Sequence, residues 1–400
     1  MSKPVYFDNN ATTAVAPEVL EEMLPILTDL YGNPSSMHSF GGQVGRYITT
    51  ARERTAAAIG CEPDEIIFTS CGSESDSTAI YSAVQAYPEK KHLVTTRVEH
   101  PAVLNVFQHL EQQGYDVTYL GVDEFGRLDL KELRASLRDD TALVSVMFAN
   151  NETGTVFPVG EIAEIVKERG ILFHTDAVQV MGKIPFTMDN LKADFVAISG
   201  HKVHAPKGVG ALYVRKSVPF RPLLRGGHQE HGRRAGTENT ASIVALGKAL
   251  ELAHENIEAE NAQVRVLRDR LEQGLLELIP DTRVNGDVDS RLPNTSSVAF
   301  KYVEGEAILL MMNMFNICAS SGSACTSGSL EPSHVLRAMG VPFTYAHGSI
   351  RFSLSRYNTD ADVDLVLAEM PKIIARLREL SPFNKDSDIE AFTGTEHHHH

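Results

Sequence analysis

Two short apolar stretches of the chain each end close to a residue that can do chemistry. Residues 171–174 have the pattern of a buried β-strand and are followed by Asp176. Residues 194–199 have the same pattern and are followed by Lys202. Because ligands of open α/β sheets bind beyond the carboxyl ends of the strands, this carboxylate and this amine would meet in one crevice. The pair favours a Schiff-base cofactor, specifically pyridoxal phosphate, although a surface lysine beside an ordinary strand-end acid fits the same spacing.

Two glycine-containing segments are candidate phosphate sites. Gly72 and Ser73 stand where a predicted strand turns into a helix, and the unpaired N–H groups of a helix N-terminus suit a phosphate. Ser73 also fits a simple N-cap, and the two roles are compatible. Residues 226–237 are basic and glycine-rich, but their two histidines lack the H-E-x-x-H spacing of a zinc site. The sequence has neither a Walker motif nor a dinucleotide fingerprint, so it disfavours a nucleotide and allows a smaller phosphate-bearing ligand.

Three further side chains are candidates for contacts with a planar cofactor or a substrate. His100 follows a predicted strand, where it could stack on a ring and move protons or be an ordinary loop residue. Asn151 follows another strong strand, where its amide could bond a ring oxygen or form an Asx turn. Arg351 lies on an alternating strand and could bind a carboxylate through two hydrogen bonds. A structural ion pair is the alternative for Arg351, and Arg356 is a rival for the carboxylate.

The segment 320–329 is made almost entirely of small residues around Cys325. Such a composition predicts an exposed and mobile loop. Cys318 differs, because its apolar neighbours are typical of a structural thiol. Since the thiolate is the nucleophilic form of cysteine, an accessible thiol that can move is a candidate for covalent sulfur chemistry. A flexible linker with an incidental thiol is the alternative.

Composition limits the classes of protein that the chain can be. Its 400 residues are 42% hydrophobic and 22% charged, with a formal net charge of −15, which argues for a globular protein without general affinity for nucleic acid or anionic membranes. No apolar stretch reaches the ~18 residues of a membrane span, and the N-terminus has no signal pattern. The four cysteines form no C-x-x-C pair, so we expect a reducing, cytoplasmic setting. The histidines at 397–400 resemble a remnant of an expression tag.

From residue 65 onward, short buried strands alternate with helices, which predicts a mostly parallel sheet with helices on both faces. Residues 211–214 are expected to add a strand at the edge of this sheet. A long periodic helix over 239–278 is expected to connect it to a smaller α+β domain. We therefore expect a large domain over 14–256, a small domain made of 1–13 and 257–384, and a tail over 385–400.

Taken together, these motifs resemble those of the cysteine desulfurases, pyridoxal-phosphate enzymes of the aspartate-aminotransferase fold type (fold type I). The matching runs cover nearly the whole chain in the family's order: DNNATT (8–13), GNPSS (32–36), EHPAV (99–103), NNE (150–152), TDAVQ (175–179), SGHK (199–202) and SGSACT (321–326). Residues 226–230 and 233–239 are most similar to the NifS-type branch, which is linked to nitrogen fixation. The resemblance implies a large domain with a mostly parallel seven-stranded sheet flanked by helices, plus a smaller α+β C-terminal domain.

The resemblance also implies how the cofactor would be held. Lys202 would bond its aldehyde, Asp176 would keep its ring nitrogen protonated, and His100 would stack on its ring. The remaining contacts would come from Asn151 and Gln179 at the ring oxygen, from Gly72, Ser73, Ser199 and His201 at the phosphate, and from Thr237 of the second subunit of a homodimer. The family often has Thr where Ser73 stands here, and this difference keeps the hydroxyl.

For the reaction, the resemblance implies a persulfide mechanism. Arg351, helped by Asn33, would bind the carboxylate of L-cysteine. Cys325 would attack the substrate sulfur, leaving L-alanine and a persulfide on the enzyme. The sulfur acceptor would be an iron–sulfur scaffold protein of the NifU type. The enzyme itself would hold no metal, although Cys325 would contact a cluster transiently on the scaffold.

Two other readings remain open at this point. A selenocysteine lyase or an aminotransferase would share the same fold. A non-enzymatic thiol or iron–sulfur carrier would use Cys325 and Cys318 instead, but the lack of clustered cysteine pairs weighs against it.

Overall fold

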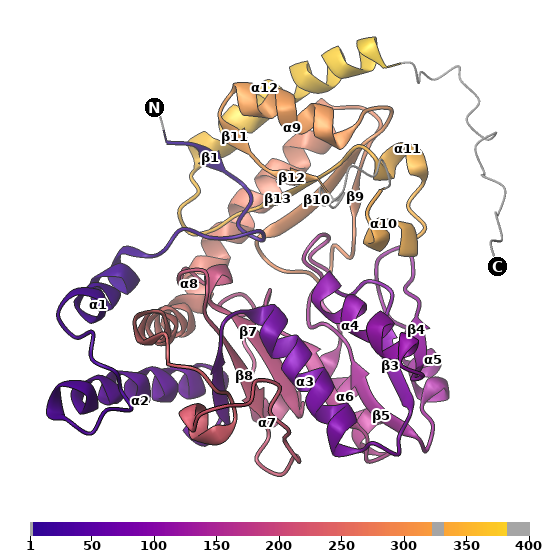
Figure 1. Ribbon diagram of the computed structural model, residues 1–400. Helices are drawn as coiled ribbons and strands as arrows, with labels where there is room; N and C mark the ends of the chain where they lie inside the picture. Colours follow the sequence, from indigo (N-terminus) through magenta and orange to yellow (C-terminus); the bar gives the residue numbers. More distant parts are fainter. Residues whose placement is uncertain (1–2, 322–331, 382–400) are drawn as a thin grey trace.

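The computed structural model describes residues 3–321 and 332–381 (Figure 1). Its main sheet has seven strands, which lie side by side in the order β2 (Ile66–Thr69), β8 (Gly210–Val214), β7 (Phe195–Ser199), β6 (Leu172–Asp176), β5 (Thr141–Ser145), β3 (His92–Thr96) and β4 (Asp116–Leu120). The five strands from β7 to β4 are parallel, and β8 runs antiparallel to both of its neighbours. The predicted α/β class with a mostly parallel seven-stranded sheet is therefore confirmed.

The position predicted for one strand is wrong. Residues 211–214 were expected at the edge of the sheet, but β8 lies between β2 and β7, and β2 forms the edge. All five residues of β8 are buried. Because every residue of this short strand is buried, its sequence shows no alternation that would distinguish a central strand from an edge strand. The order of the strands therefore cannot be predicted from it.

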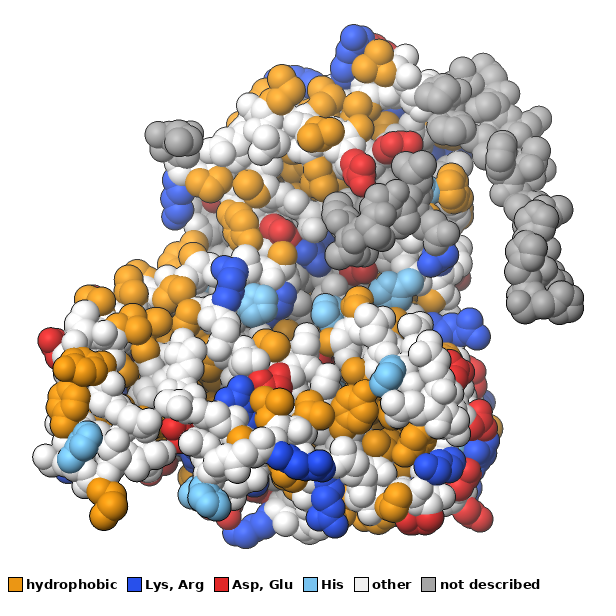
Figure 2. All heavy atoms as spheres, in the orientation of Figure 1, with side chains coloured by type: hydrophobic (Ala, Val, Ile, Leu, Met, Phe, Trp, Pro, Cys, Tyr) orange, Lys and Arg blue, Asp and Glu red, His pale blue; other side chains and the backbone are white. Residues whose placement is uncertain are grey.

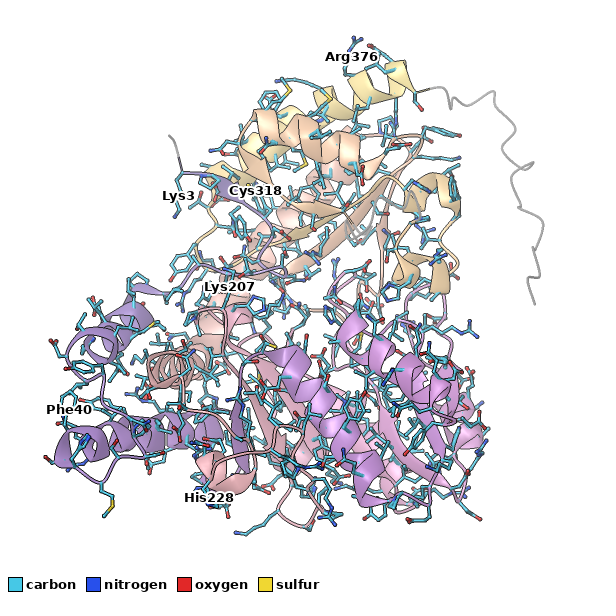
Figure 3. All side chains as sticks on the ribbon, in the orientation of Figure 1. Lys3, Phe40, Lys207, His228, Cys318 and Arg376 are labelled. Carbon is cyan, nitrogen blue, oxygen red and sulfur yellow. The ribbon has the colours of Figure 1, made fainter. Side chains whose placement is uncertain are left out.

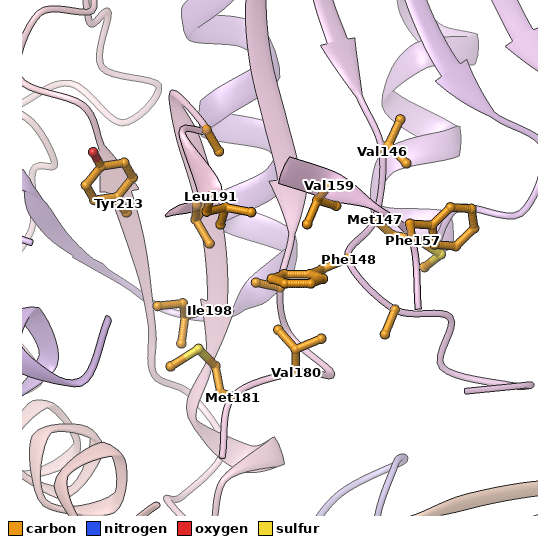
Figure 4. Close-up of a cluster of buried hydrophobic side chains, with 14 of the residues drawn as sticks. Val146, Met147, Phe148, Phe157, Val159, Val180, Met181, Leu191, Ile198 and Tyr213 are labelled. Carbon is orange, nitrogen blue, oxygen red and sulfur yellow. The ribbon is translucent and has the colours of Figure 1, made fainter. Parts of the chain in front are cut away.

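Alternating side chains of the sheet bury two separate apolar faces. Leu172 packs on one face with α3 (Gly72–Ala86) and α4 (Pro101–Gln112). Phe173, the next residue of β6, points into the other cluster, because successive side chains of a strand face opposite ways. Figure 4 shows part of this second cluster, in which Phe148, Val180 and Ile198 lie directly beside the carboxyl ends of β5 to β7. The strand ends that carry the candidate residues are thus fixed by packing.

The second face of the sheet is covered by several helices. Within the described chain, those in contact with it or with each other are α1 (Pro17–Thr28), α2 (Ser39–Ile59), α5 (Leu130–Ser136), α6 (Val159–Lys167), α7 (Met188–Leu191) and the first part of α8 (Thr240–Leu278). Of the helices that the structure describes, none is long and apolar enough to cross a membrane.

A smaller sheet stands above the main one in Figure 1. Its strand order is β12 (Ser320–Ser321), β13 (Ser349–Ser353), β10 (Thr295–Phe300) and β9 (Thr282–Asn285). It packs with α9 (Gly305–Met314), α12 (Asp360–Leu380) and the second part of α8, and α10 (His334–Ala338) and α11 (Phe343–Ala346) lie beside it. The N-terminal strand β1 (Val5–Tyr6) pairs with β11 (Ile317–Cys318), so the first residues belong with this sheet.

Helix α8 joins the two halves of the molecule. Its residues up to Leu250 are buried in the core of the large sheet, whereas those from Val264 to Leu275 are buried in the core of the small sheet. This distribution agrees with a long connecting helix. The exact domain limits at residues 13 and 256 stay a prediction.

We predict that the second part of α8 contributes strongly to stability. Leu271 is completely buried, so Leu271→Ala should lower the free energy of unfolding by about 2–5 kcal/mol. Leu278→Ala on the same helix is the control, since Leu278 is 52% exposed and its loss should change the value by less than about 0.5 kcal/mol. Urea unfolding followed by circular dichroism measures both, because the sequence has no tryptophan for fluorescence. Equal losses for the two variants would contradict the prediction.

Candidate active site

The two strand-end residues predicted from the sequence lie close enough for their charges to interact, at the ends of neighbouring parallel strands. Asp176 is the last residue of β6, is 7% exposed, and accepts a hydrogen bond from the Val178 N–H at 2.8 Å. The neighbouring parallel strand β7 ends at Ser199 and continues into a single turn, η2 (Gly200–Lys202), which ends at Lys202. The charges of Lys202 and Asp176 interact, and each shifts the pKa of the other toward its ionised form. The predicted pairing of amine and acid is consistent with this geometry.

Burial makes the Lys202 amine unusually acidic. Its Nζ donates hydrogen bonds to the carbonyl oxygens of Asn10 at 2.6 Å and Ala11 at 2.7 Å. Loss of water around the ammonium, and then the nearby Arg351 guanidinium, lower the pKa of Lys202 to about 8. An amine with such a pKa is a better nucleophile near neutral pH than an ordinary lysine, since more of it is unprotonated.

The Asp176 carboxyl is buried without a cationic hydrogen-bond partner among the described residues. Burial raises its pKa, while the His100 ring, the Val178 N–H and Lys202 oppose that rise. A second buried carboxyl, Asp76 on α3, has its pKa raised well above the usual range, by burial and then by the charge of Asp176. A protonated ring nitrogen is the kind of ligand group that would offset the cost of ionising Asp176 in this place.

His100 lies at the N-terminus of α4, with its ring beside the same crevice. Its Nδ1 accepts a hydrogen bond from the Ala102 N–H at 3.1 Å, so the proton of the neutral ring is on Nε2. Its pKa is lowered, first because protein atoms displace water from the ring and then because Lys202 and His334 are nearby. Asp176 acts in the opposite direction. The ring is therefore neutral near pH 7 and can donate or shuttle a proton from Nε2.

Two of the predicted phosphate residues, Gly72 and Ser199, lie next to each other beside these strand ends. A Cβ atom on Gly72 would come within 2.8 Å of the Val178 side chain, so glycine allows α3 to begin this close to the segment that follows β6. The buried Ser199 Oγ has no hydrogen-bond partner among the described residues. His201 donates to or accepts from the Thr12 hydroxyl at 3.2 Å, and burial lowers its pKa to about 4. Together with the helix N-terminus at Gly72 and Ser73, this corner suits a phosphate, whose oxygens would pair with Ser199.

Asn10 is the residue that joins the crevice to the small sheet. Its carbonyl accepts hydrogen bonds from both Lys202 and the Gln179 Nε2, the latter at 3.0 Å. Its side-chain amide donates to the Asn151 carbonyl at 3.2 Å and to Thr295 at 2.8 Å. Gln179 keeps a buried Oε1 without a partner in the described chain. The fit of Gln179 and Asn151 to a ring oxygen stays a prediction. The unpaired Oε1 only accepts hydrogen bonds, so a contact from Gln179 would need either a protonated ring oxygen or release of Nε2 from the Asn10 carbonyl.

Arg351 reaches the same crevice from β13. Its guanidinium donates to the Asn151 carbonyl at 3.0 Å and to Asp8 at 2.7 Å, and its buried Nε has no partner among the described residues. The rival Arg356 donates to Glu260 on α8 at 2.6 Å. Arg351 thus has one unpaired donor, whereas Arg356 is engaged in an ion pair that links α8 to the small domain.

Two of the predicted residues are exposed in segments away from the strand ends, and a third is not described by the structure. Asn33 lies in the exposed segment between α1 and α2, at the far left of the large domain in Figure 1. Thr237 is exposed in the segment before α8. Cys325 lies outside the described residues.

Sequence reasoning assigned no role to several residues that the structure places at the site. Asp8 and Asn10 fall in the run 8–13, which was recognised only as a turn and a family motif. Glu152 accepts a hydrogen bond from Ser333 at 2.5 Å, and His334 bonds the Glu99 carbonyl at 2.9 Å. These contacts join residues far apart in the sequence, and no periodicity or local motif reports such a contact.

The comparisons with known proteins agree with this site. A family model described as "Aminotransferase class-V" matches residues 5–366. A "Cysteine desulfurase" from Trichormus azollae is 64% identical over 382 residues, 96% of each chain. "Cysteine desulfurase NifS" from Azotobacter vinelandii is 58% identical over 380 residues, 95% of this chain and 94% of that one. A solved structure titled "NIFS-LIKE PROTEIN" superposes with a TM-score of 0.89 at 40% identity and covers 94% of this chain and all of its own.

A match over most of the chain, together with relatives of such identity, defines the family. The chain belongs to the class V aminotransferases, which are pyridoxal-phosphate enzymes. Within them it falls among the NifS-type cysteine desulfurases, as the sequence resemblance predicted.

The lowered pKa of Lys202 predicts how its amine captures an aldehyde. With a pKa of about 8, the fraction of Lys202 that is unprotonated increases tenfold per pH unit below pH 8 and becomes constant above it. The rate of Schiff-base formation between cofactor-free protein and pyridoxal phosphate should follow the same curve in stopped-flow absorbance. For an ordinary lysine the rise would continue to about pH 10.4, and that outcome would contradict the assignment. Lys202→Ala, as a control, should form no adduct that borohydride traps.

Proposed function

We propose that this protein converts L-cysteine to L-alanine and holds the released sulfur on Cys325 as a persulfide. The observation that supports the proposal is the proximity of Lys202, Asp176 and Arg351: Asp176 raises and Arg351 lowers the pKa of Lys202, and Arg351 belongs to the small domain. An amine, a buried acid and a carboxylate-binding guanidinium are the groups that a pyridoxal-phosphate enzyme needs for an amino-acid substrate.

The cofactor assigned to this crevice is pyridoxal 5′-phosphate. Lys202 would bond its aldehyde, Asp176 its ring nitrogen, and His100 would lie against its ring. Its phosphate would be held by Gly72, Ser73, Ser199 and His201, and its ring oxygen by Asn151 and Gln179. When bound, the group serves as an electron sink that weakens bonds around the substrate's α-carbon.

The residues of the chain then divide the work of orienting substrate and moving protons. Arg351 would bind the substrate carboxylate, whose second oxygen finds the unpaired Nε, and this contact competes with Asp8 for the guanidinium. Lys202, with a pKa of about 8, can exchange a proton with the α-carbon near neutral pH. His100 can pass a proton from Nε2 because its ring is neutral in this environment.

Cys325 is assigned the sulfur chemistry. Its thiolate attacks the substrate sulfur, an S–S bond forms, and the C–S bond breaks with its electron pair left on the carbon, which takes up a proton to give alanine. Two described thiols are poor rivals, because burial raises the pKa of Cys318 and raises that of Cys61 to about 12. In Figure 3, Cys318 lies beside the N-terminal strand of the small domain.

The segment that carries Cys325 joins the described chain next to the site at both ends. On one side, Ser320 pairs with Arg351 itself in the small sheet. On the other side, Ser333 donates a hydrogen bond to Glu152, in the loop that also supplies Asn151. This placement supports delivery of the thiol to a substrate held by Arg351.

A homodimer is part of the proposal. Leu20, Leu24 and Leu27 form an exposed stripe along α1, with exposed fractions of 51%, 52% and 55%, and Tyr31 and Phe40 continue it. Figure 2 shows these apolar side chains gathered over α1 and α2, and such patches mark protein interfaces. Thr237 would complete the phosphate site of the second subunit, and Asn33, which is exposed on the same side, would reach substrate there too.

The sulfur acceptor would be an iron–sulfur scaffold protein of the NifU type, in the cytoplasm and in support of nitrogenase maturation. The similarity to the Azotobacter vinelandii NifS supports this setting. The acidic net charge of −15 supports a small-molecule substrate rather than nucleic acid.

Removal of the thiol should separate cofactor binding from sulfur transfer. Cys325→Ala is expected to keep the cofactor's visible absorbance but to release sulfide from L-cysteine, with added reductant, at less than about one-thousandth of the wild-type rate. Mass spectrometry should find a 32-Da adduct on Cys325 in the wild type only (about one sulfur atom). Cys318→Ala is the matched control and should retain activity. An active Cys325→Ala protein, or a keto acid as product instead of alanine, would overturn the proposal.

Replacement of the two arginines should identify the carboxylate ligand. Arg351→Lys loses bidentate geometry, so KM for L-cysteine should rise at least about tenfold. Arg356→Lys retains its charge beside Glu260 and should change KM by less than about twofold. Steady-state kinetics with both variants measure the difference. The opposite order of effects would assign the substrate to Arg356.

A further inference from the structure

The segment that precedes α8 has a strained backbone. Glu230 and His231 both have left-handed backbone angles, with φ of 49° and 57°, and Gly232 follows with φ of 78°. Residues with a Cβ adopt this conformation at a cost, so two in succession persist only where surrounding contacts impose them. We call residues 226–237 the crossing loop. Its conformation therefore has to be imposed by side-chain contacts.

The first of these contacts is a buried ion pair. The Glu230 carboxylate, whose side chain is 3% exposed, accepts hydrogen bonds from both terminal nitrogens of Arg52 on α2, at 2.8 and 2.5 Å. It also accepts the backbone N–H of Phe68 in β2 at 3.0 Å. Arg52 donates in addition to the Ile66 carbonyl. A bidentate, buried pair of this kind fixes geometry more tightly than an exposed pair.

The second contact lies at the start of α3. Arg234 donates two hydrogen bonds to Glu74, at 2.9 and 3.1 Å. Glu74 also accepts the Ser70 N–H at 2.8 Å, and it stands in the first turn of the helix that begins at Gly72. The crossing loop is therefore attached to the same β2–α3 corner that provides Gly72 and Ser73 for the phosphate.

Beyond these two attachments the loop ends at an exposed residue, Thr237. Its neighbour Glu238 has a buried Oε2 that finds no hydrogen-bond partner within residues 3–321 and 332–381. In Figure 3 the labelled His228 marks this loop at the surface of the large domain, on the side of the molecule where Phe40 of the exposed apolar patch also lies. The attachments thus hold a polar segment at the face that we assign to the second subunit.

We propose that Glu230 and Arg234 are positioning residues for the other subunit: they hold the crossing loop so that Thr237 reaches the partner's phosphate site. The β2–α3 corner of each subunit would then hold its own cofactor phosphate and, in addition, the crossing loop that reaches the cofactor site of the other subunit. This inference rests on the proposed function, because it assumes that the phosphate of pyridoxal phosphate lies at Gly72 and Ser73. It adds that two ion pairs remote from the ring control cofactor affinity across the subunit boundary.

The competing explanation is that both ion pairs only stabilise the corner of their own chain. The two explanations differ in which subunit of a dimer suffers when an attachment is lost. Heterodimers with a single live site separate them, since Lys202→Ala removes the amine of one site and leaves its loop intact. Arg234→Gln is the main variant, because the Arg234 side chain is 22% exposed and its loss leaves little buried charge unpaired in the core.

Two heterodimers, purified through two different affinity tags, contain the same substitutions in different arrangements. In the split form, one chain has Lys202→Ala and the other has Arg234→Gln. The site that keeps its lysine is then in the Arg234→Gln chain, and the crossing loop that reaches it comes from the Lys202→Ala chain and is intact. In the joined form, one chain has both substitutions and its partner is wild type. The site that keeps its lysine is then in the wild-type chain, and the crossing loop that reaches it comes from the doubly substituted chain. Cofactor-free heterodimers are titrated with pyridoxal phosphate by absorbance, and borohydride with mass spectrometry confirms the adduct on Lys202.

We expect the split form to bind pyridoxal phosphate with wild-type affinity and the joined form to bind it about tenfold more weakly, the loss of one hydrogen bond to a charged group. With Glu230→Gln in place of Arg234→Gln, the joined form should again bind pyridoxal phosphate more weakly than the split form. Lys216→Gln, at an exposed ion pair with Asp64 before the start of β2, is the control and should give equal affinity in the two forms. Equal affinity in the two forms, or weaker binding by the split form, would overturn the inference. A wild-type homodimer that forms no adduct on Lys202 would instead refute the proposed function itself.

Discussion

The site depends on the burial of an amine and an acid at the ends of two neighbouring parallel strands. Water is largely excluded from both Lys202 and Asp176, so each group resists ionisation and each lowers that cost for the other. The parallel pairing of β6 with β7 makes this meeting unavoidable, since their carboxyl ends share one edge. The apolar cluster behind these strand ends keeps the edge rigid, so the pair is held in place before any ligand arrives.

A second constraint comes from the N-terminal segment. Asn10 accepts hydrogen bonds from Lys202 and Gln179 of the large domain, while its amide bonds Thr295 of the small sheet. Arg351 approaches the same place from β13. The proposed substrate site therefore lies where the two sheets meet, and α8 fixes how they meet because its two parts are buried in different cores. Loss of packing in the small domain should for this reason change the positions of Asn10 and Arg351 relative to Lys202.

The large domain also connects the crevice to its exposed face. The corner between β2 and α3 contributes Gly72 to the site and holds the crossing loop through the Arg234–Glu74 ion pair, while Glu230 of the loop pairs with Arg52 of α2 and accepts the Phe68 N–H of β2. Buried charge pairs add little net stability but fix a unique geometry, which suits a loop whose backbone is strained at Glu230 and His231. The geometry of one site and the presentation of Thr237 are in this way properties of the same corner.

The amino-acid sequence alone determined the class of fold and the long helix before the small domain, and it predicted that Lys202 and Asp176 act together, because strand and helix periods and strand-end positions are local features. The family motifs added the proposal that Cys325 carries the sulfur. Only the tertiary structure decided that β8 is an interior strand, that Asn10 and Asp8 line the crevice, that Arg356 pairs with Glu260, and that Asn33 and Thr237 lie apart from the site in their own chain. Each of these depends on contacts between residues far apart in the sequence, and such contacts are set by how whole elements pack rather than by any local pattern.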